Sequence, residues 1–566
     1  MVMEECKEAI LSEDYRDFMF IPKWNSLLKP LNQAMYCIKE VGGLYKNIYI
    51  QKEEAQKIPE NDIPYYSVPK CYTPLDMGAL NAAGITTVQG YPSLELKGQG
   101  VLMGFLDTGI DYQNQVFRNL DGSTRILGIW DQTIQTGNPP GRMDYGSFYT
   151  REDINRALKS DNPYEFVPTK DENGHGTFTA SVAAGGANTE NQFLGAAPES
   201  MIAMVKLKPA KQYLREYYFI REGAEAFQEN DMLAGLYFLD QLAEKYEMPL
   251  ILCIPLGCNL GGHNGSAPIC EELEIYANKK NTVVVTGTGN EADKRHHYQG
   301  TTTQGSGGDE VEIRFGQGVK GIQMEIWTDI PNVLAISLTS PSGEMIQKIP
   351  IRQNSRNEYD FLFEKTKVII DYRLLVERTN SELIIVRFVT PAQGIWKIKV
   401  EPLQSIDGLF HIWMPVTEFL TGEAYFLRSS PEETILEPGS TPSAITVSYY
   451  NWEENAVAIQ SGRGYTRNRM IKPEFTAPGM YVTGAVPGGN FTERSGSSAA
   501  TGLTAGAAAL LLQWIVTDQQ SQASSAQVKN ILILGTRRKS GTEYPNRLWG
   551  YGTLDLYHAF EEIRQL

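Results

Sequence analysis

The 566-residue sequence contains only six cysteines and no long apolar run. No Cys-x-x-Cys pair and no Cys/His spacing typical of zinc is present, so we expect mostly reduced core cysteines and not a disulfide framework. A membrane helix needs about 18 apolar residues. The longest candidate, Ala505 to Val516, is shorter and contains Gln513. We therefore expect no membrane insertion.

Positive charge is also scarce. The chain has 51 Lys and Arg against 67 Asp and Glu, a formal net charge of -16. Nucleic acids and anionic membranes favour clusters of Lys and Arg, so neither is expected as a partner. The acidic N-terminus, MVMEECKEAILSEDYRDF, lacks the apolar segment of a Sec signal peptide. These features predict synthesis in the cytoplasm without Sec export.

Four regions differ in their pattern of apolar residues. Residues 1–70 mix short strand-like and helical runs and end in the Pro-rich segment PENDIPYYSVP, which is typical of a linker. In residues 71–300, short apolar runs alternate with helical patterns, which predicts an α/β fold with a parallel sheet. Residues 301–430 contain alternating runs separated by turn residues, the pattern of an antiparallel β-sandwich or jelly roll. Residues 431–566 return to the α/β pattern, so the all-β region is predicted to be an insert.

Three short motifs carry residues suited to nucleophilic catalysis. FLDTGID contains Asp107, NGHGTFTASVAAG contains His175, and SGSSAATG contains Ser498. Each motif alone has an ordinary interpretation, as a turn, a capping histidine or a helix N-cap. Together they follow the chain order Asp, His, Ser, which is the subtilisin order.

The sequence resembles the subtilases, the subtilisin-family serine proteases. The resemblance lies in VLMGFLDTGID, NGHGTFTASVAAG and RSGSSAATGLTAGAAAL, and it places the nucleophile at Ser498 and not at Ser497. VVVTGTGNEA resembles the strand that ends in the oxyanion-hole asparagine, here Asn290. The resemblance implies a parallel seven-stranded sheet sandwiched by helices and an α+β prodomain over residues 1–70, whereas a plain subtilase has only a few tens of residues in place of the predicted jelly-roll insert.

The expected chemistry is that of a serine endopeptidase of peptidase family S8. His175 would take the proton of Ser498, and Asp107 would orient and stabilise the imidazole. The amide of Asn290 would bind the developing oxyanion.

Other residues are expected to contact the substrate without taking part in the chemistry. Leu256 and Gly257 would pair with the substrate backbone as an added strand, and Gly289 would also line the binding site. Loop carboxylates such as Asp111 are expected to be solvated. We predict neither a metal nor another cofactor.

A narrower resemblance is to the Csp germination proteases of spore-forming Firmicutes. It lies in DGSTRILGIWDQT, YTREDINRAL and GYGTLDLYHAF, and in the position of the β-insert. It implies a protein substrate, a cortex-hydrolase precursor activated during germination, and a spore-associated location. It also implies that the chain's own prodomain binds the active site after self-cleavage within about residues 60–80.

Two departures from the family pattern leave an alternative open. Gly502 follows Thr501 where subtilases usually have proline, and Ala499 replaces a methionine. We expect the glycine to loosen the start of the helix and to alter the setting of Ser498 slightly. The alternative function is a catalytically silent subtilase-fold sensor or scaffold in germinant signalling. A lipase or esterase would need Gly-x-Ser-x-Gly and the order Ser, Asp, His, so that class is excluded.

Overall fold

The structure is a computed structural model. It describes residues 9, 12, 14–20, 28–40, 46–58, 78–92, 94–305, 307–347, 349–376 and 379–565. The chain divides into two units, residues 1–75 and 76–566. The Pro-rich linker and residues 60–77 of the predicted cleavage region lie outside the described residues.

The first unit contains a three-stranded antiparallel sheet in the order β1-β3-β2. Its core includes Phe18, Ile48 and Ile50, so the α+β pattern of the sequence corresponds to a small packed unit. Cys37 is disulfide-bonded, whereas the other cysteines that the structure describes, Cys253, Cys258 and Cys270, are free. The elements are β1 (Tyr15–Phe20), η2 (Gln33–Met35), β2 (Tyr36–Glu40), β3 (Lys46–Gln51) and α2 (Lys52–Ala55).

The second unit is built on a nine-stranded sheet, ordered β22-β21-β9-β8-β4-β7-β5-β6 with β23 beside β21. All pairs from β23 to β5 are parallel, which gives the predicted seven parallel strands, and β22 and β6 add an antiparallel strand at each edge. The strands are β4 (Leu102–Asp107), β5 (Ile126–Asp131), β6 (Ser147–Thr150), β7 (Met201–Lys206), β8 (Leu250–Ile254), β9 (Thr282–Gly287), β21 (Ile445–Asn451), β22 (Ala456–Val457) and β23 (Phe475–Pro478).

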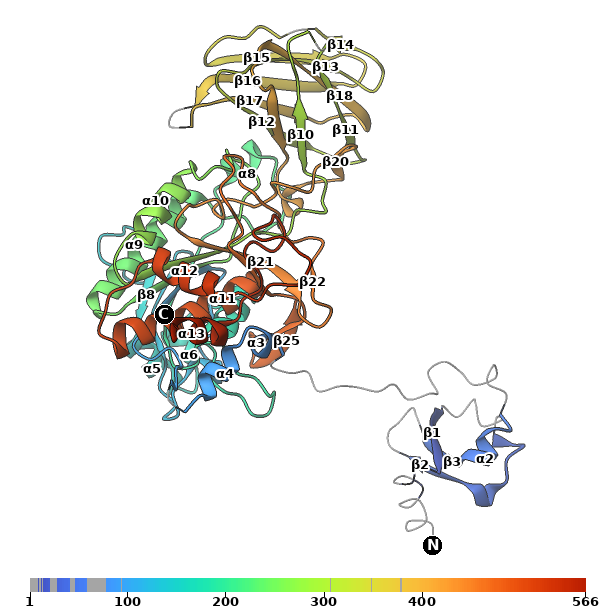
Figure 1. Cartoon of the computed structure of the whole chain (residues 1–566), viewed down its shortest axis with the longest axis vertical. Helices are drawn as coiled ribbons and strands as arrows, with labels where there is room; N and C mark the ends of the chain where they lie inside the picture. The colour runs from blue at the N-terminus through green and yellow to red at the C-terminus, as the bar shows by residue number, and fades with distance from the viewer. Residues whose placement is uncertain are drawn as a thin grey trace. The chain divides into compact units, whose positions relative to one another are not determined.

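Helices cover both faces of this sheet (Figure 1). Leu102 and Leu106 of β4 belong to the core shared with α9 and α10, whereas Met103 and Phe105 belong to the opposite core, with α7, α11 and α12. Burial on both sides explains why the strands are continuous apolar runs. The helices are α3 (Gly78–Ala82), α4 (Ile85–Gly90), η5 (Gln115–Phe117), α5 (Arg151–Leu158), α6 (Pro163–Phe166), α7 (His175–Ala184), α8 (Gln212–Tyr217), α9 (Glu229–Lys245), α10 (Pro268–Ala277), α11 (Ser497–Leu512), α12 (Ser525–Leu534) and α13 (Leu556–Ile563).

Helix α11 is a central core element. With the π-helical segment η7 (Gln513–Asp518) it is long and apolar enough to cross a membrane, but 83% of the apolar window is buried inside the protein, as in a core helix. The helix is continuous through Gly502, so the expected loosening is absent. A Cβ there would lie 3.0 Å from the Thr179 carbonyl oxygen, so the glycine allows α11 to approach α7 closely.

The predicted all-β insert forms two antiparallel sheets packed face to face, at the top of Figure 1. Their orders are β10-β19-β12-β17-β16-β15 and β14-β13-β18-β11-β20. Aromatic residues such as Tyr372, Phe388 and Trp396 fill the space between them. The elements are β10 (His297–Thr301), β11 (Asp309–Phe315), β12 (Gly321–Asp329), β13 (Val333–Thr339), β14 (Met345–Ile346), β15 (Ser355–Phe361), β16 (Thr366–Val376), β17 (Ser381–Val389), β18 (Gly394–Gln404), β19 (Leu409–Trp413), η6 (Thr417–Phe419) and β20 (Ala424–Phe426). A separate hairpin, β24 (Val482–Val486) and β25 (Asn490–Arg494), precedes α11.

Candidate active site

Asp107 is the last residue of β4 and is fully buried. Its Oδ1 accepts a hydrogen bond from the Thr108 N–H at 2.7 Å. The His175 Nδ1 lies 2.7 and 3.0 Å from the two carboxylate oxygens. A buried carboxylate held this way fixes both the orientation and the tautomer of the imidazole.

His175 is the first residue of α7. The preceding Gly174 has φ +79°, in the left-handed region that favours glycine. A Cβ on the following Gly176 would overlap the Gly109 carbonyl oxygen, so only glycine allows α7 to begin this close to the Asp107 loop. The two glycines that flank the histidine in the sequence therefore position it against the carboxylate.

Ser498 faces His175 from the first turn of α11. The distance between the His175 Nε2 and the Ser498 Oγ is 2.9 Å, and the Oγ also lies 3.1 Å from the Pro255 carbonyl oxygen. Burial lowers the pKa of His175, but the charge and hydrogen bond of the Asp107 carboxylate outweigh it, so this pKa is raised above its ordinary value of 6.5.

Asn290 follows β9 and is exposed beside the start of α11. Its Oδ1 accepts a hydrogen bond from the Ser497 N–H at 3.0 Å. Ser497 in turn accepts a hydrogen bond at its Oγ from the Gly289 N–H, also at 3.0 Å. Among the described residues none accepts a hydrogen bond from the Asn290 Nδ2, so this N–H group is available to a ligand next to Ser498.

Leu256 and Gly257 directly follow Pro255, whose carbonyl oxygen contacts Ser498. Neither makes a backbone hydrogen bond to another segment in the part of the chain that the structure describes. The next residue, Cys258, pairs with Glu437 through two hydrogen bonds of 2.9 Å. Leu256 and Gly257 therefore form a strand edge with free backbone groups, which the Cys258–Glu437 pair holds in place at one end.

Leu436 lies between the segments that contain Gly257 and Gly289, a position that the sequence did not predict. A Cβ on Gly257 would lie 2.9 Å from the Leu436 Cβ, and one on Gly289 would overlap its Cδ1. The leucine is held by a hydrogen bond of 3.1 Å from its N–H to the Thr288 carbonyl oxygen. No local motif indicates this residue, because it belongs to the segment that returns from the insert.

A second site residue that was missed is Asp171, which lies shortly before the NGHG motif and is buried. Its Oδ1 accepts hydrogen bonds of 2.8 Å from the Thr108 hydroxyl and the Gly174 N–H. Its Oδ2 accepts from the Thr177 N–H and hydroxyl at 2.8 and 2.7 Å. Asp171 thus joins the loop after Asp107 to the first turn of α7. Its place four residues before His175 was an available signal.

Asp111 is not solvated, contrary to expectation. It is 7% exposed, and its Oδ2 accepts a hydrogen bond of 2.9 Å from the Gly488 N–H in the β24–β25 turn. Burial raises the pKa of this carboxyl. The residue connects the Asp107 loop to the hairpin that leads to Ser498.

Known proteins are similar to this chain at the level of sequence and of fold. The CspB protease of Clostridium perfringens, a solved structure, is 29% identical, with a TM-score of 0.75 over 86% of this chain and 99% of that chain. Two subtilisin-like proteases of Arabidopsis thaliana, SBT2.3 and SBT2.2, are 28% and 31% identical over 24% and 20% of this chain. The matched parts span only 18% and 14% of those two proteins.

The family model of the subtilases matches residues 98–361 and 427–552. These ranges cover both parts of the α/β region and more than half of the chain. The similarity to CspB also extends into the β-insert, since it covers 86% of this chain and the insert is too long to lie wholly within the unmatched remainder. The predicted family is therefore confirmed: the chain belongs to the subtilase family of serine endopeptidases.

Proposed function

We propose that the protein is an active serine endopeptidase in which Ser498 attacks the peptide carbonyl carbon. His175 takes the hydroxyl proton and delivers it to the leaving amine, and Asp107 stabilises the imidazolium. Water then attacks the acyl-enzyme, and His175 takes a proton from the water and delivers it to the Ser498 Oγ as the acyl group leaves. The observation that carries the proposal is the continuous contact of Ser498 Oγ to His175 Nε2 at 2.9 Å and of His175 Nδ1 to Asp107 at 2.7 Å.

The groups around the nucleophile support the same chemistry. The free Asn290 Nδ2 and the Ser498 backbone N–H, which has no intrahelical partner in the first turn, would bind the oxyanion. The open backbone of Leu256 and Gly257 would hold the substrate in an extended conformation. Gly289 would line the side of the pocket opposite to Gly257.

Labelling with a fluorophosphonate probe tests the catalytic assignment. We expect the wild-type chain to be labelled at Ser498 and the Ser498→Ala variant not to be labelled. Ser495→Ala is the matched control, because Ser495 is an exposed serine three residues away. Labelling that persists in Ser498→Ala would contradict the assignment.

We also propose that the chain cleaves itself within about residues 60–80 and that its prodomain then occupies the active site. The physiological substrate would be a spore cortex-hydrolase precursor, and the protein would be stored with the spore. The similarity to the CspB protease supports this proposal. The test is the N-terminus of the purified protein by mass spectrometry, with Ser498→Ala as the uncut reference, followed by incubation with the precursor.

The second candidate is a silent sensor or scaffold, and the position of Leu436 favours it. This side chain packs against both Gly257 and Gly289, the two glycines proposed to flank the substrate pocket, and would narrow it. A folded wild-type chain that is neither labelled nor cut would place this candidate first.

A further inference from the structure

Three of the six histidines of the chain are buried together around Trp413, where the β-sandwich joins the α/β part: His263, His297 and His411. This cluster lies outside the candidate active site. His297 begins β10 and His411 lies on the neighbouring strand β19. Because His297 is paired with Trp413, two residues from His411, both imidazoles project from the same face of the sheet.

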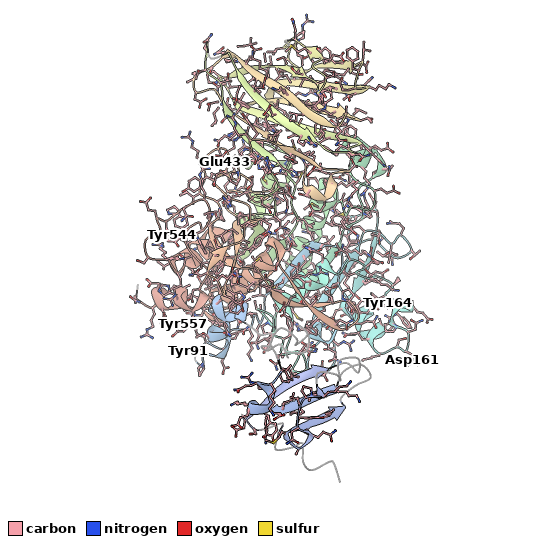
Figure 2. The ribbon with its side chains drawn as sticks, turned by 90° about the vertical axis from the view of Figure 1, so that its right-hand side faces the viewer. Tyr91, Asp161, Tyr164, Glu433, Tyr544 and Tyr557 are labelled. Atoms are coloured by element: carbon pink, nitrogen blue, oxygen red, sulfur yellow. The ribbon has the colours of Figure 1, made fainter. Side chains whose placement is uncertain are left out.

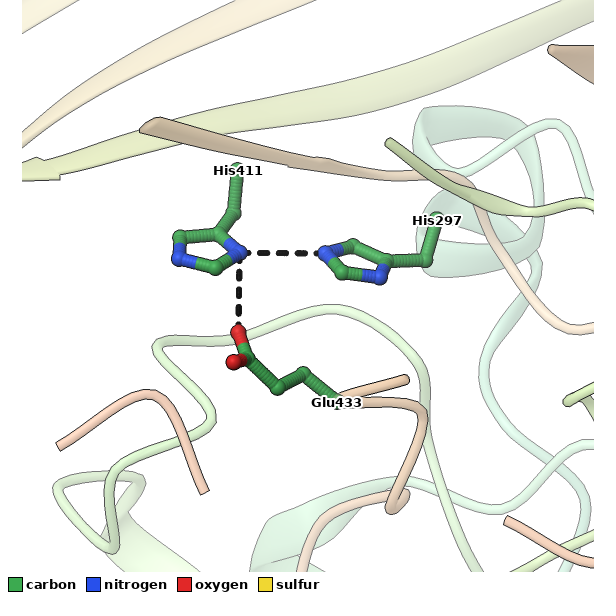
Figure 3. Close-up of side chains that lie close together, drawn as sticks. All are labelled: His297, His411 and Glu433. Carbon is green, nitrogen blue, oxygen red and sulfur yellow. Dashed lines mark hydrogen bonds and ion pairs between the residues drawn. The ribbon is translucent and has the colours of Figure 1, made fainter. Parts of the chain in front are cut away.

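Glu433 completes the group from the segment that returns to the α/β part. Figure 2 shows this residue at the boundary between the sandwich and the layers below it. Its Oε2 lies 3.1 Å from the His411 Nδ1, which in turn lies 3.1 Å from the His297 Nε2 (Figure 3). One ligand atom from each residue lies within 4.8 Å of the other two. The exposed fractions of His297, His411 and Glu433 are 0%, 2% and 8%.

Hydrogen bonding alone does not satisfy these three atoms. The His411 Nδ1 lies between the His297 Nε2 and the Glu433 Oε2. If both imidazoles are neutral and the carboxylate is ionised, this nitrogen carries at most one proton. It can then donate a hydrogen bond to only one of its two neighbours. The Glu433 Oε2 is buried and accepts no well-aligned hydrogen bond from any described residue, although His411 is within ion-pair distance. An atom that accepts three lone pairs would satisfy all three groups at once.

The spacing suits a first-row transition metal. Two ligands bound at about 2.0–2.2 Å to a tetrahedral Zn²⁺ lie about 3.3–3.5 Å apart, close to the two contacts of 3.1 Å. The third pair, Glu433 Oε2 and His297 Nε2, lies within 4.8 Å, and these two atoms would move toward one another on binding. Two imidazoles with one carboxylate form a ligand set that zinc and its neighbours prefer over calcium or magnesium.

The surroundings hold these side chains in place. The rings of His297 and His411 stack on Trp413 at centroid distances of 4.8 and 5.1 Å, and the Trp413 Nε1 donates to the Glu433 carbonyl oxygen at 3.1 Å. The Arg547 Nη1 lies 3.3 Å from the other carboxylate oxygen of Glu433, Oε1, so Oε2 is directed toward the histidines. These contacts fix the ring planes and the carboxylate, whereas the ring nitrogens that would face away from the ion, His297 Nδ1 and His411 Nε2, make no hydrogen bond to a described residue.

Glu433 also borders a cavity, in which three arginines would have to be compensated by the carboxylate and by water if a cation bound. The cavity has a volume of about 350 Å³ and is also lined by Gln299, Leu409, Tyr465, Arg467, Arg469 and Arg547. It can supply a water molecule as the fourth ligand, since the three side chains leave one tetrahedral position open.

We propose that His297, His411 and Glu433 bind one divalent transition-metal ion of the zinc type. The ion joins two strands of the sandwich to the segment that leads into Leu436 and the substrate-binding region. Its role is structural, because it fixes the sandwich to the α/β part. The site is independent of the proposed peptidase chemistry.

Zinc binding to the full-length chain tests the site. The chain is stripped with a chelator and titrated with Zn²⁺ by calorimetry, and Co²⁺ is used as a spectroscopic probe of tetrahedral coordination. We expect one ion per wild-type chain and an affinity lower by more than about tenfold in His411→Gln and Glu433→Gln. His263→Gln is the matched control, because His263 also stacks on Trp413, at 4.1 Å, but its ring nitrogens bond to the carbonyl oxygens of Ile435 and Asn259.

Thermal unfolding provides a second measurement if a histidine variant folds poorly. Zinc should raise the Tm of the wild type and of His263→Gln, because an ion that binds only the folded state stabilises that state. It should leave the Tm of Glu433→Gln unchanged. Glu433→Gln keeps the shape of the side chain and removes the charged ligand. Absence of zinc binding by the wild type, or equal binding by Glu433→Gln, would overturn the proposal.

Discussion

The Asn290 side chain is oriented by Ser497, the residue before the proposed nucleophile, whose N–H donates to the Asn290 Oδ1 at 3.0 Å. This bond occupies the oxygen and directs the NH₂ group outward. Two consecutive peptide units therefore provide both proposed parts of the oxyanion site: the Ser497 N–H orients Asn290, and the next N–H in the chain, that of Ser498, is the second donor. The amide is in place before substrate binds, as electrostatic preorganisation requires.

Asn290→Ala should lower kcat by about 10²–10³-fold, because it removes one oxyanion donor. The change should fall on kcat more than on KM, since the donor acts mainly in the transition state. Steady-state hydrolysis of a peptide substrate measures both constants. Asn138→Ala, at an exposed loop position, is the control. Equal kcat values for the two variants would show that Asn290 has no role in the oxyanion site.

Asp107→Asn should change both the rate and its pH dependence. His175 must be unprotonated to act as a base, so kcat/KM rises as the pH passes its pKa. Since the Asp107 carboxylate raises that pKa, removal of its charge should move this rise to lower pH. The rate itself should fall by about 10⁴-fold, because the tautomer is no longer fixed. A pH–rate profile measures both effects, with exposed Asp121→Asn as reference. An unshifted acid limb would argue against the proposed pair.

Leu436→Ala should widen the preference for the residue before the cleaved bond. The leucine fills space next to Gly257 and Gly289, so its truncation should admit larger apolar side chains. We expect kcat/KM for a large apolar residue, relative to alanine, to rise about tenfold or more. A peptide library gives this ratio within each variant, which removes the effect of any change in stability. Leu427→Ala, 38% exposed, should keep the wild-type ratio, and an unchanged ratio in Leu436→Ala would place the leucine outside the pocket.

Asp171→Ala should lower the free energy of unfolding by about 2–4 kcal/mol, because it leaves buried donors without an acceptor. Four hydrogen bonds of 2.7–2.8 Å are lost with this carboxylate. Urea denaturation measures the change. Asp161→Ala is the control, since Asp161 lies in an exposed loop (Figure 2) and should change the free energy by less than about 0.5 kcal/mol. Similar values for the two variants would refute the proposed anchoring role.

Short motifs were sufficient to predict the parallel sheet and the groups that surround Ser498. The residues that position each of these groups are its neighbours in the sequence, as Gly174 and Gly176 flank His175. The local sequence is therefore enough to predict where the side chain lies. Leu436 and Glu433 could not be found this way, because they act on residues far away in the chain. Their contacts exist only after the sandwich has folded and returned the chain to β9. The prediction that Gly502 loosens its helix was wrong for the same reason, since the role of this glycine depends on its close approach to Thr179 in a different helix.

The chain enters and leaves the sandwich at adjacent points. The Phe426 N–H donates to the Arg295 carbonyl oxygen at 3.1 Å, and the Ser430 N–H donates to the His297 carbonyl oxygen at 2.9 Å. A segment whose two ends meet can be gained in one genetic event without breaking the host sheet. Leu436 lies shortly after this junction, in the α/β part, and its N–H bonds to the Thr288 carbonyl oxygen. A change in the length of the segment that leaves the sandwich would therefore also displace a residue beside the proposed substrate pocket.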